Sequence, residues 1–125
     1  MEGRMSDFLG IHGTSLILRE QRLQVLASNL ANADTPGFQA QDMDFNTALQ
    51  AVLAPAAGAS GEDPYQSAAN LARYARPSAQ PSLDGNTVDT SREQAAFSQA
   101  ALEYRASMSF VESKVRTMLT AITGQ

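Results

Sequence analysis

The chain has 125 residues, enough for one domain, of which 43% are hydrophobic and 18% charged. A formal net charge of −4 argues against a nucleic-acid partner, and the absence of cysteine excludes disulfides and thiolate chemistry. The charge is concentrated in the centre: residues 36–90 hold two basic and six acidic side chains, whereas residues 1–35 sum to −1 and residues 91–125 to +1. The nearly neutral ends are therefore expected to be the packing elements, because they can pack against each other or against copies of themselves without large repulsion.

The first region, residues 1–35, is predicted to form one long helix over about 6–32. Apolar residues recur every seven positions along it, and a second apolar row lies about 160° around the helix. A helix that is apolar on two sides needs neighbours on two sides. The first row is Leu9, Leu16, Leu23 and Leu30, and the second is Ile11, Leu18 and Val25.

The second region, residues 36–53, is predicted to begin with a turn. Pro36-Gly37 fits the two central positions of a type II turn, and proline also disfavours a helix at the residue before it. Residues 38–45 then have an extended pattern, and residues 46–53 are predicted to form a short helix. The two alternative N-caps of this helix are Asp44 and Asn46.

The third region, residues 54–89, is rich in alanine, glycine, serine and proline. Residues 54–82 are predicted to be a loop or a partly disordered insert, and residues 83–86 a turn centred on an Asp-Gly pair. Four aromatic or basic residues of the insert either make a surface contact or stay mobile. They are Tyr65, Arg73, Tyr74 and Arg76.

The fourth region, residues 90–125, carries the clearest predicted helix. Thr90 and Glu93 match a capping box, and Gly124 is a natural stop. Between them, apolar residues alternate at spacings of four and three, as in a coiled-coil seam, with a second apolar surface at Leu102, Phe110 and Leu119. The seam is Phe97, Ala101, Tyr104, Met108, Val111, Val115, Met118 and Ile122.

These regions predict a mainly α fold. Its two long terminal helices pair as an antiparallel coiled coil, and its centre is extended and rich in loops. A lone hairpin of this kind leaves its second apolar rows in water. We therefore expect an isolated subunit with loosely ordered ends that become rigid in an oligomer.

Residues 28–40 closely resemble the N-terminal signature of the flagellar rod, hook and related axial proteins. Two asparagines are expected to hydrogen-bond backbone where the helix unravels, and Pro-Gly then reverses the chain. The similarity extends over residues 8–45 and 82–123, and residues 83–89 are similar to a segment of small proximal-rod subunits. The motif residues are Ser28, Asn29, Ala31, Asn32, Thr35, Pro36, Gly37 and Phe38.

The resemblance implies a structural subunit of the proximal rod that transmits motor torque. It implies a periplasmic location and export through the flagellar type III apparatus without a cleaved signal. The implied partners are copies of itself, other rod subunits and the adaptor protein at the membrane ring. No cofactor, metal, nucleic acid or small-molecule substrate is expected. Met1 and Met5 are alternative starts of the chain.

Other interpretations have less support in the sequence. Another small proximal-rod protein is the alternative within the family, and a helical module resembling an export chaperone is the alternative outside it. An enzyme is not expected, because the acidic pairs Asp42/Asp44 and Glu62/Asp63 have no partner base or nucleophile nearby in sequence. The single histidine, His12, has no neighbouring metal ligands in the sequence.

Overall fold

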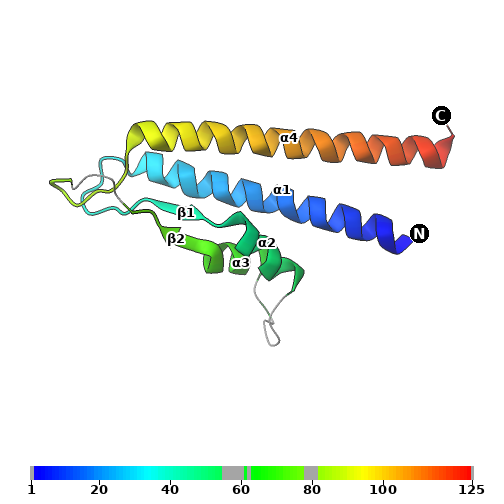
Figure 1. The fold of residues 1–125 in the computed structure, drawn as a ribbon, viewed down its shortest axis with the longest axis horizontal. Coiled ribbons are helices and arrows are strands. Elements are labelled where there is room, and N and C mark those ends of the chain that lie inside the picture. The colour runs from blue at the N-terminus through cyan, green and yellow to red at the C-terminus, as the bar shows by residue number, and fades with distance from the viewer. Residues whose placement is uncertain (1, 55–60, 62, 78–81, 125) are drawn as a thin grey trace.

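The computed structural model describes residues 2–54, 61, 63–77 and 82–124. Two long helices lie side by side and antiparallel, so that the start of one and the end of the other share one end of the molecule (Figure 1). The shorter elements cover the opposite side of the first helix, which is therefore the middle layer. The elements are α1 (Glu2–Ala31), β1 (Gln41–Met43), α2 (Phe45–Leu53), α3 (Pro64–Ala72), β2 (Arg73–Ala75) and α4 (Thr90–Thr123).

Helix α1 has its two neighbours within its own chain. Leu18 and Val25 of the second predicted row are 0% and 6% exposed. Leu18 belongs to a core that it shares with Met43 of β1, with residues of α2 and with alanines of α3. The expectation that a lone subunit leaves this row in water is wrong for these two residues, because the central elements fold onto it. Ile11, the third member of the row, stays 41% exposed.

The central region holds more regular structure than its composition predicts. Strands β1 and β2 pair antiparallel, with Asp42 opposite Tyr74. The loop predicted over residues 54–82 is wrong for residues 64–75, which form α3 and β2; residues 55–60, 62 and 78–81 of that loop lie outside the described residues. Helix α3 begins on the Asp63 cap with Pro64 at its first position, where a missing N–H costs nothing.

Alanine makes up much of the interior. Six of the ten hydrophobic residues that are buried in the described part of the chain are alanines, including three from α3. A small side chain lets backbones approach closely, so α3 packs against α1 and α2 without large apolar residues. An alanine-rich sequence therefore gave no sign of a buried helix face. The buried alanines are Ala40, Ala48, Ala68, Ala69, Ala72 and Ala100.

The ends of α2 and α4 test the predicted caps. Asp44 caps α2, because its carboxylate accepts from the N–H of Thr47 at 3.3 Å. The capping box predicted for α4 is wrong: the N-cap is Asp89, one residue earlier, and the carboxylate of Glu93 faces α1 instead of the helix start. Gly124 ends α4 with a φ of +74°, as expected of a glycine C-cap.

Candidate assembly site

Two turns lie against each other where the chain leaves α1 and where it approaches α4. The N–H of Phe38 donates to the carbonyl of Thr35 at 3.2 Å, and Gly37 has a φ of +74°, which confirms the type II turn. The predicted second turn is also present, with Gly85 at a φ of +77°. The N–H of Gly37 donates to the carbonyl of Asp84 at 2.8 Å. We call residues 35–38 and 82–86 together the double turn.

Asn86 joins the double turn to the end of α1. Its side-chain nitrogen lies 2.8 to 2.9 Å from the carbonyl oxygens of Asn32, Ala33 and Thr35. Its side-chain oxygen accepts from the N–H of Val88 at 2.8 Å. The residue is 7% exposed, so these contacts replace water at three carbonyl oxygens just beyond the end of α1.

The other motif residues divide into those that bond locally and those that face solvent. The side chain of Asn32 donates to the carbonyl of Ser28 at 2.8 Å and accepts from the hydroxyl of Thr35 at 3.1 Å, so it bonds backbone where the helix ends, as expected. Phe38 is half-buried. The exposed motif residues are Ser28, Ala31, Thr35, Pro36 and Gly37.

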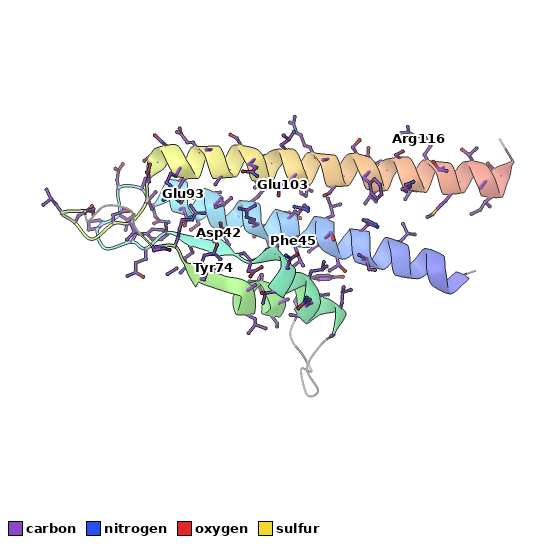
Figure 2. The ribbon with its side chains drawn as sticks, in the orientation of Figure 1. Asp42, Phe45, Tyr74, Glu93, Glu103 and Arg116 are labelled. Atoms are coloured by element: carbon purple, nitrogen blue, oxygen red, sulfur yellow. The ribbon has the colours of Figure 1, made fainter. Side chains whose placement is uncertain are left out.

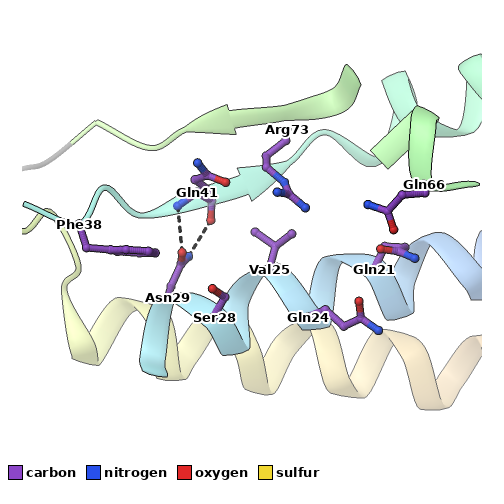
Figure 3. Close-up of a pocket in the computed structure, with 9 residues that line it drawn as sticks. All are labelled: Gln21, Gln24, Val25, Ser28, Asn29, Phe38, Gln41, Gln66 and Arg73. Atoms are coloured by element: carbon purple, nitrogen blue, oxygen red, sulfur yellow. Dashed lines mark hydrogen bonds between the residues drawn. The ribbon is translucent and has the colours of Figure 1, made fainter. Parts of the chain in front are cut away.

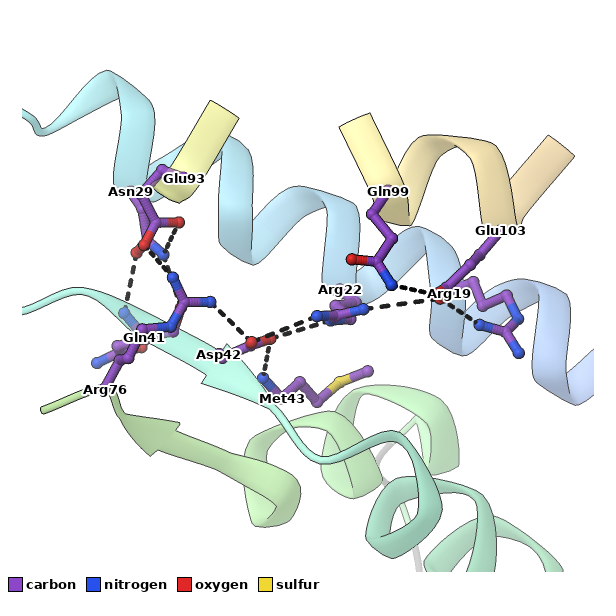
Figure 4. A network of polar contacts seen from close by, with 10 residues as sticks. All are labelled: Arg19, Arg22, Asn29, Gln41, Asp42, Met43, Arg76, Glu93, Gln99 and Glu103. Atoms are coloured by element: carbon purple, nitrogen blue, oxygen red, sulfur yellow. Dashed lines mark hydrogen bonds and ion pairs between the residues drawn. The ribbon is translucent and has the colours of Figure 1, made fainter. Parts of the chain in front are cut away.

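A polar network joins four segments beside the double turn (Figure 4). The amide of Asn29 accepts from the N–H of Gln41 at 3.0 Å and donates to the carbonyl of the same residue at 2.6 Å. It also donates to Glu93 Oε2 at 3.0 Å. Arg76 donates to the second oxygen of Glu93 and, through Nη2, to Asp42 Oδ2 at 2.7 Å. Helix α1, strand β1, the end of the β2 segment and α4 therefore meet here.

The network continues along α1 toward the middle of α4. Arg22 Nε lies 3.1 Å from Asp42 Oδ1, and Arg22 Nη1 lies 3.7 Å from Glu103 Oε2. Arg19 donates to the same oxygen of Glu103 at 2.8 Å and lies over the ring of Phe45 with Cζ at 4.4 Å from its centroid. Figure 2 shows Asp42, Glu93 and Glu103 between the layers. Three arginines balance three carboxylates: Arg19, Arg22 and Arg76 against Asp42, Glu93 and Glu103.

The environment of Asp42 favours its charged form. Burial alone would raise the pKa of this carboxyl, because desolvation disfavours the charge. Hydrogen bonds from Arg22, from the N–H of Met43 at 2.7 Å and from Arg76 outweigh burial, so the pKa of Asp42 lies below its usual range. The hydrogen bond to Asp42 raises the pKa of Arg22. Asp42 and its two arginine partners therefore carry their charges at neutral pH.

Known proteins are similar to this chain over nearly its whole length. A family model described as "Flagella basal body rod protein" matches residues 9–39, which hold most of α1 and the first turn. A flagellar basal body rod protein FlgB from Aeromonas hydrophila is 39% identical over 122 residues, covering 93% of this chain and 92% of that protein. FlgB from Escherichia coli is 39% identical over 98% of the chain and 97% of its own length, and FlgB from Salmonella typhimurium is 36% identical over 99% of both.

The chain belongs to the FlgB family of flagellar basal body rod proteins. This membership confirms the recognition of the axial signature and the expectation of a structural rod protein. The matched segment ends at residue 39, directly after the type II turn, so it includes residues 35–38 of the double turn.

The first apolar row predicted on α1 lies on one face of that helix. At 100° per residue, its four leucines lie within about 60° of His12. The ring of His12 contacts the ring of Phe110 on α4, with centroids 4.9 Å apart. The row therefore faces the α4 side of α1, where each member is half-buried: Leu9, Leu16, Leu23 and Leu30.

The predicted α4 seam lies to one side of the contact with α1. The fully buried residues of α4 are Glu93 and Ala100, which are not seam residues. At 100° per residue the centre of the seam lies about 50° around the helix from Ala100. Val115 and Ile122 are 37% and 72% exposed. The other seam residues are half-buried: Phe97, Ala101, Tyr104, Met108, Val111 and Met118.

A polar groove of about 200 Å³ lies on the side of α1 that faces β1 and α3 (Figure 3). None of its nine lining residues is a carboxylate, histidine or cysteine, so the lining holds no candidate general base and no metal ligand of these types. Among the described residues, no three histidines, aspartates or glutamates lie together as a metal site would require. The groove is lined by Gln21, Gln24, Val25, Ser28, Asn29, Phe38, Gln41, Gln66 and Arg73.

Sequence reasoning missed three residues that organise this FlgB-family site. Glu93 was assigned to a capping box, Arg76 was left between a surface contact and mobility, and Asn86 was only part of a turn. Each acts through partners 17 to 64 positions away, beyond the reach of helical spacing or turn chemistry. Charge balance offered the one usable signal, since Arg76 is one of only two basic residues between positions 36 and 90.

The helices show no membrane-spanning character in the part of the chain described. None of them combines the length and the hydropathy that crossing a bilayer requires.

Proposed function

We propose that the chain is a subunit of the proximal rod, in the periplasm, whose terminal helices pack against copies of itself and other rod subunits. Packed helices of this kind transmit motor torque, because a close-packed interior passes strain on instead of flowing. Its further partners are the adaptor protein at the membrane ring and the flagellar type III export apparatus, which exports it without a cleaved signal. The relatives' shared name, flagellar basal body rod protein, supports the rod assignment.

The observation that carries the proposal is an apolar surface on α4 that the chain does not cover. Three large hydrophobic side chains in the second half of this helix are 37% to 72% exposed and lie within about 60° of one another around its axis. Exposed apolar patches on soluble proteins mark surfaces that bind other proteins. We call this set the α4 outer surface: Val115, Leu119 and Ile122.

Deletion of the gene tests the assignment to the rod. Cells without the protein are expected to be non-motile, and electron microscopy of their basal bodies should show no completed rod. A plasmid copy should restore swimming. Motile cells with intact rods would reject the proposal.

Single substitutions on the α4 outer surface test the assembly interface. Ile122→Asp and Leu119→Asp place a charge where packing is expected and should block rod assembly while the subunit is still exported. Ser113→Asp introduces the same charge about 180° from Ile122, at an exposed polar position, and should leave motility intact. The half-buried seam variants Val111→Asp and Met118→Asp should also block assembly. Normal swimming of the Ile122 and Leu119 variants would exclude this surface as the interface.

A further inference from the structure

Glu93 carries the most deeply buried charge in the described part of the chain. It is 1% exposed and lies on α4 opposite Asn29 of α1 (Figure 4). The amide of Asn29 gives it a neutral hydrogen bond at 3.0 Å, whereas its ion pair in the described structure is with Arg76. The pairing of the two long helices thus buries a carboxylate whose counter-charge comes from neither helix.

Arg76 is held in place by the central elements. It follows β2, and its backbone N–H donates to the carbonyl of Ala40, just before β1, at 2.8 Å. Its Nη2 donates to Asp42 of β1, which is 6% exposed. The guanidinium therefore reaches Glu93 when β1 and β2 are paired and seated on α1.

We propose that the Arg76–Glu93 pair couples the two halves of the fold, so that the first part of α4 closes on α1 when residues 73–76 are docked. We call residues 90–103 the turn-proximal part of α4. This role goes beyond membership of the rod, because it concerns how one subunit reaches its folded shape.

The coupling follows from the cost of burying an unpaired charge. With residues 73–76 undocked, closing α4 would remove Glu93 from water with only Asn29 to bond it, which is unfavourable for an ionised carboxylate. The other two arginines of the polar network cannot replace Arg76, because they pair with Asp42 and Glu103.

The dependence is also reciprocal. Without α4, Arg76 and Arg22 would share the single carboxylate of Asp42, and Arg76 would lose one of its two partners. Docking of residues 73–76 is therefore more favourable when α4 is closed on α1. Closure of α4 is likewise more favourable when residues 73–76 are docked. Linkage of this kind makes two packing events behave as one cooperative unit.

Hydrogen exchange measured by mass spectrometry on the full chain tests the coupling. In Arg76→Gln, amides in the turn-proximal part of α4 and in residues 73–76 should both exchange at least about tenfold faster than in wild type. In the double variant Arg76→Gln/Glu93→Gln, no charge is left unpaired at this point. Exchange in the turn-proximal part of α4 should therefore return to within about threefold of wild type.

Arg73→Gln is the matched control. It removes the same charge three residues earlier on the same segment, at an exposed side chain outside the polar network. It should leave exchange in residues 90–103 unchanged. The proposal is overturned if Arg76→Gln affects only residues 73–76, if the double variant exchanges as fast as Arg76→Gln, or if wild type shows no protection in either segment.

Discussion

Gly37 and Gly85 lie back to back, so that a β-carbon built on Gly85 would sit 3.5 Å from the Cα of Gly37. Both residues have a positive φ, and the N–H of Gly37 reaches the carbonyl of Asp84, the residue before Gly85. The contact at 3.5 Å is ordinary van der Waals contact. The backbone conformation, and not space, is therefore what restricts position 85 to glycine.

Gly85→Ala is expected to destabilise the fold by about 1–2 kcal/mol, because alanine is strained in a left-handed conformation. Urea unfolding followed by circular dichroism measures the change. Gly10→Ala is the control, since Gly10 lies within α1 and a β-carbon added there would meet nothing within 4 Å. That change should stabilise the helix by up to about 1 kcal/mol. Equal destabilisation by both would contradict the argument from φ.

Asn86→Ala should cost about 2 kcal/mol, because it removes the buried side-chain donor that the carbonyl oxygens of Asn32, Ala33 and Thr35 share. Exchange of the amides around residues 35–40 should accelerate in parallel. Asn46→Ala changes an exposed asparagine of α2 and should stay within about 0.5 kcal/mol of wild type. If the two variants unfold at the same urea concentration, Asn86 is not the link between the turns.

Substitutions at the start of α4 distinguish the two caps. Asp89 accepts from the N–H groups of Ser91 and Arg92, so Asp89→Ala should lower the free energy of unfolding by about 1 kcal/mol. Thr90→Ala, at an exposed position within the helix, should change it by less than about 0.5 kcal/mol. If Thr90→Ala lowered the free energy of unfolding more than Asp89→Ala, Thr90 and not Asp89 would be the N-cap of α4.

The charge on Asp42 makes part of the stability depend on pH. The pKa of Asp42 is lowered in the folded state. The contribution of its charge to the free energy of unfolding is therefore fully present above the unfolded pKa of about 3.9. It is lost as pH falls through the lower, folded pKa. The difference in free energy of unfolding between wild type and Asp42→Asn should therefore be largest near pH 7 and narrow below about pH 4.

Asp34→Asn gives the contribution of an exposed carboxylate under the same conditions. Its difference from wild type should be small at neutral pH. A difference for Asp42→Asn that stays constant from pH 7 to pH 3 would show that the ion pairs with Arg22 and Arg76 contribute nothing.

Features governed by local chemistry were predictable from the sequence. The heptad leucines of α1, the Pro36-Gly37 turn and the Gly124 stop each depend on residues within one or two helical turns. The antiparallel pairing of the terminal helices followed from their two long apolar seams, and the family membership followed from the motif at residues 28–40.

Features governed by distant partners were not predictable. Thr90 and Glu93 satisfy the local rule for a capping box, but Glu93 gains more from Arg76 and Asn29, which lie far away in the sequence. Helix α3 was missed because alanines form its buried face, and a segment rich in alanine, glycine, serine and proline is typical of a loop. The rotation of the α4 seam away from α1 has the same origin, since the small residue Ala100, and no seam residue, is fully buried.

The polar contacts between α1 and α4 involve two carboxylates in the first half of α4. Glu93 accepts from Asn29, and Glu103 pairs with Arg19 and Arg22. Thr123 ends the helix twenty residues after Glu103, about 30 Å further along the axis. Two rods joined at one end can spread at the other, and a rotation of about 5° at the joint moves a tip 30 Å away by about 2.6 Å. A small rotation at the end that holds Glu93 and Glu103 would therefore shift the α4 outer surface relative to α1 and leave these polar contacts in place.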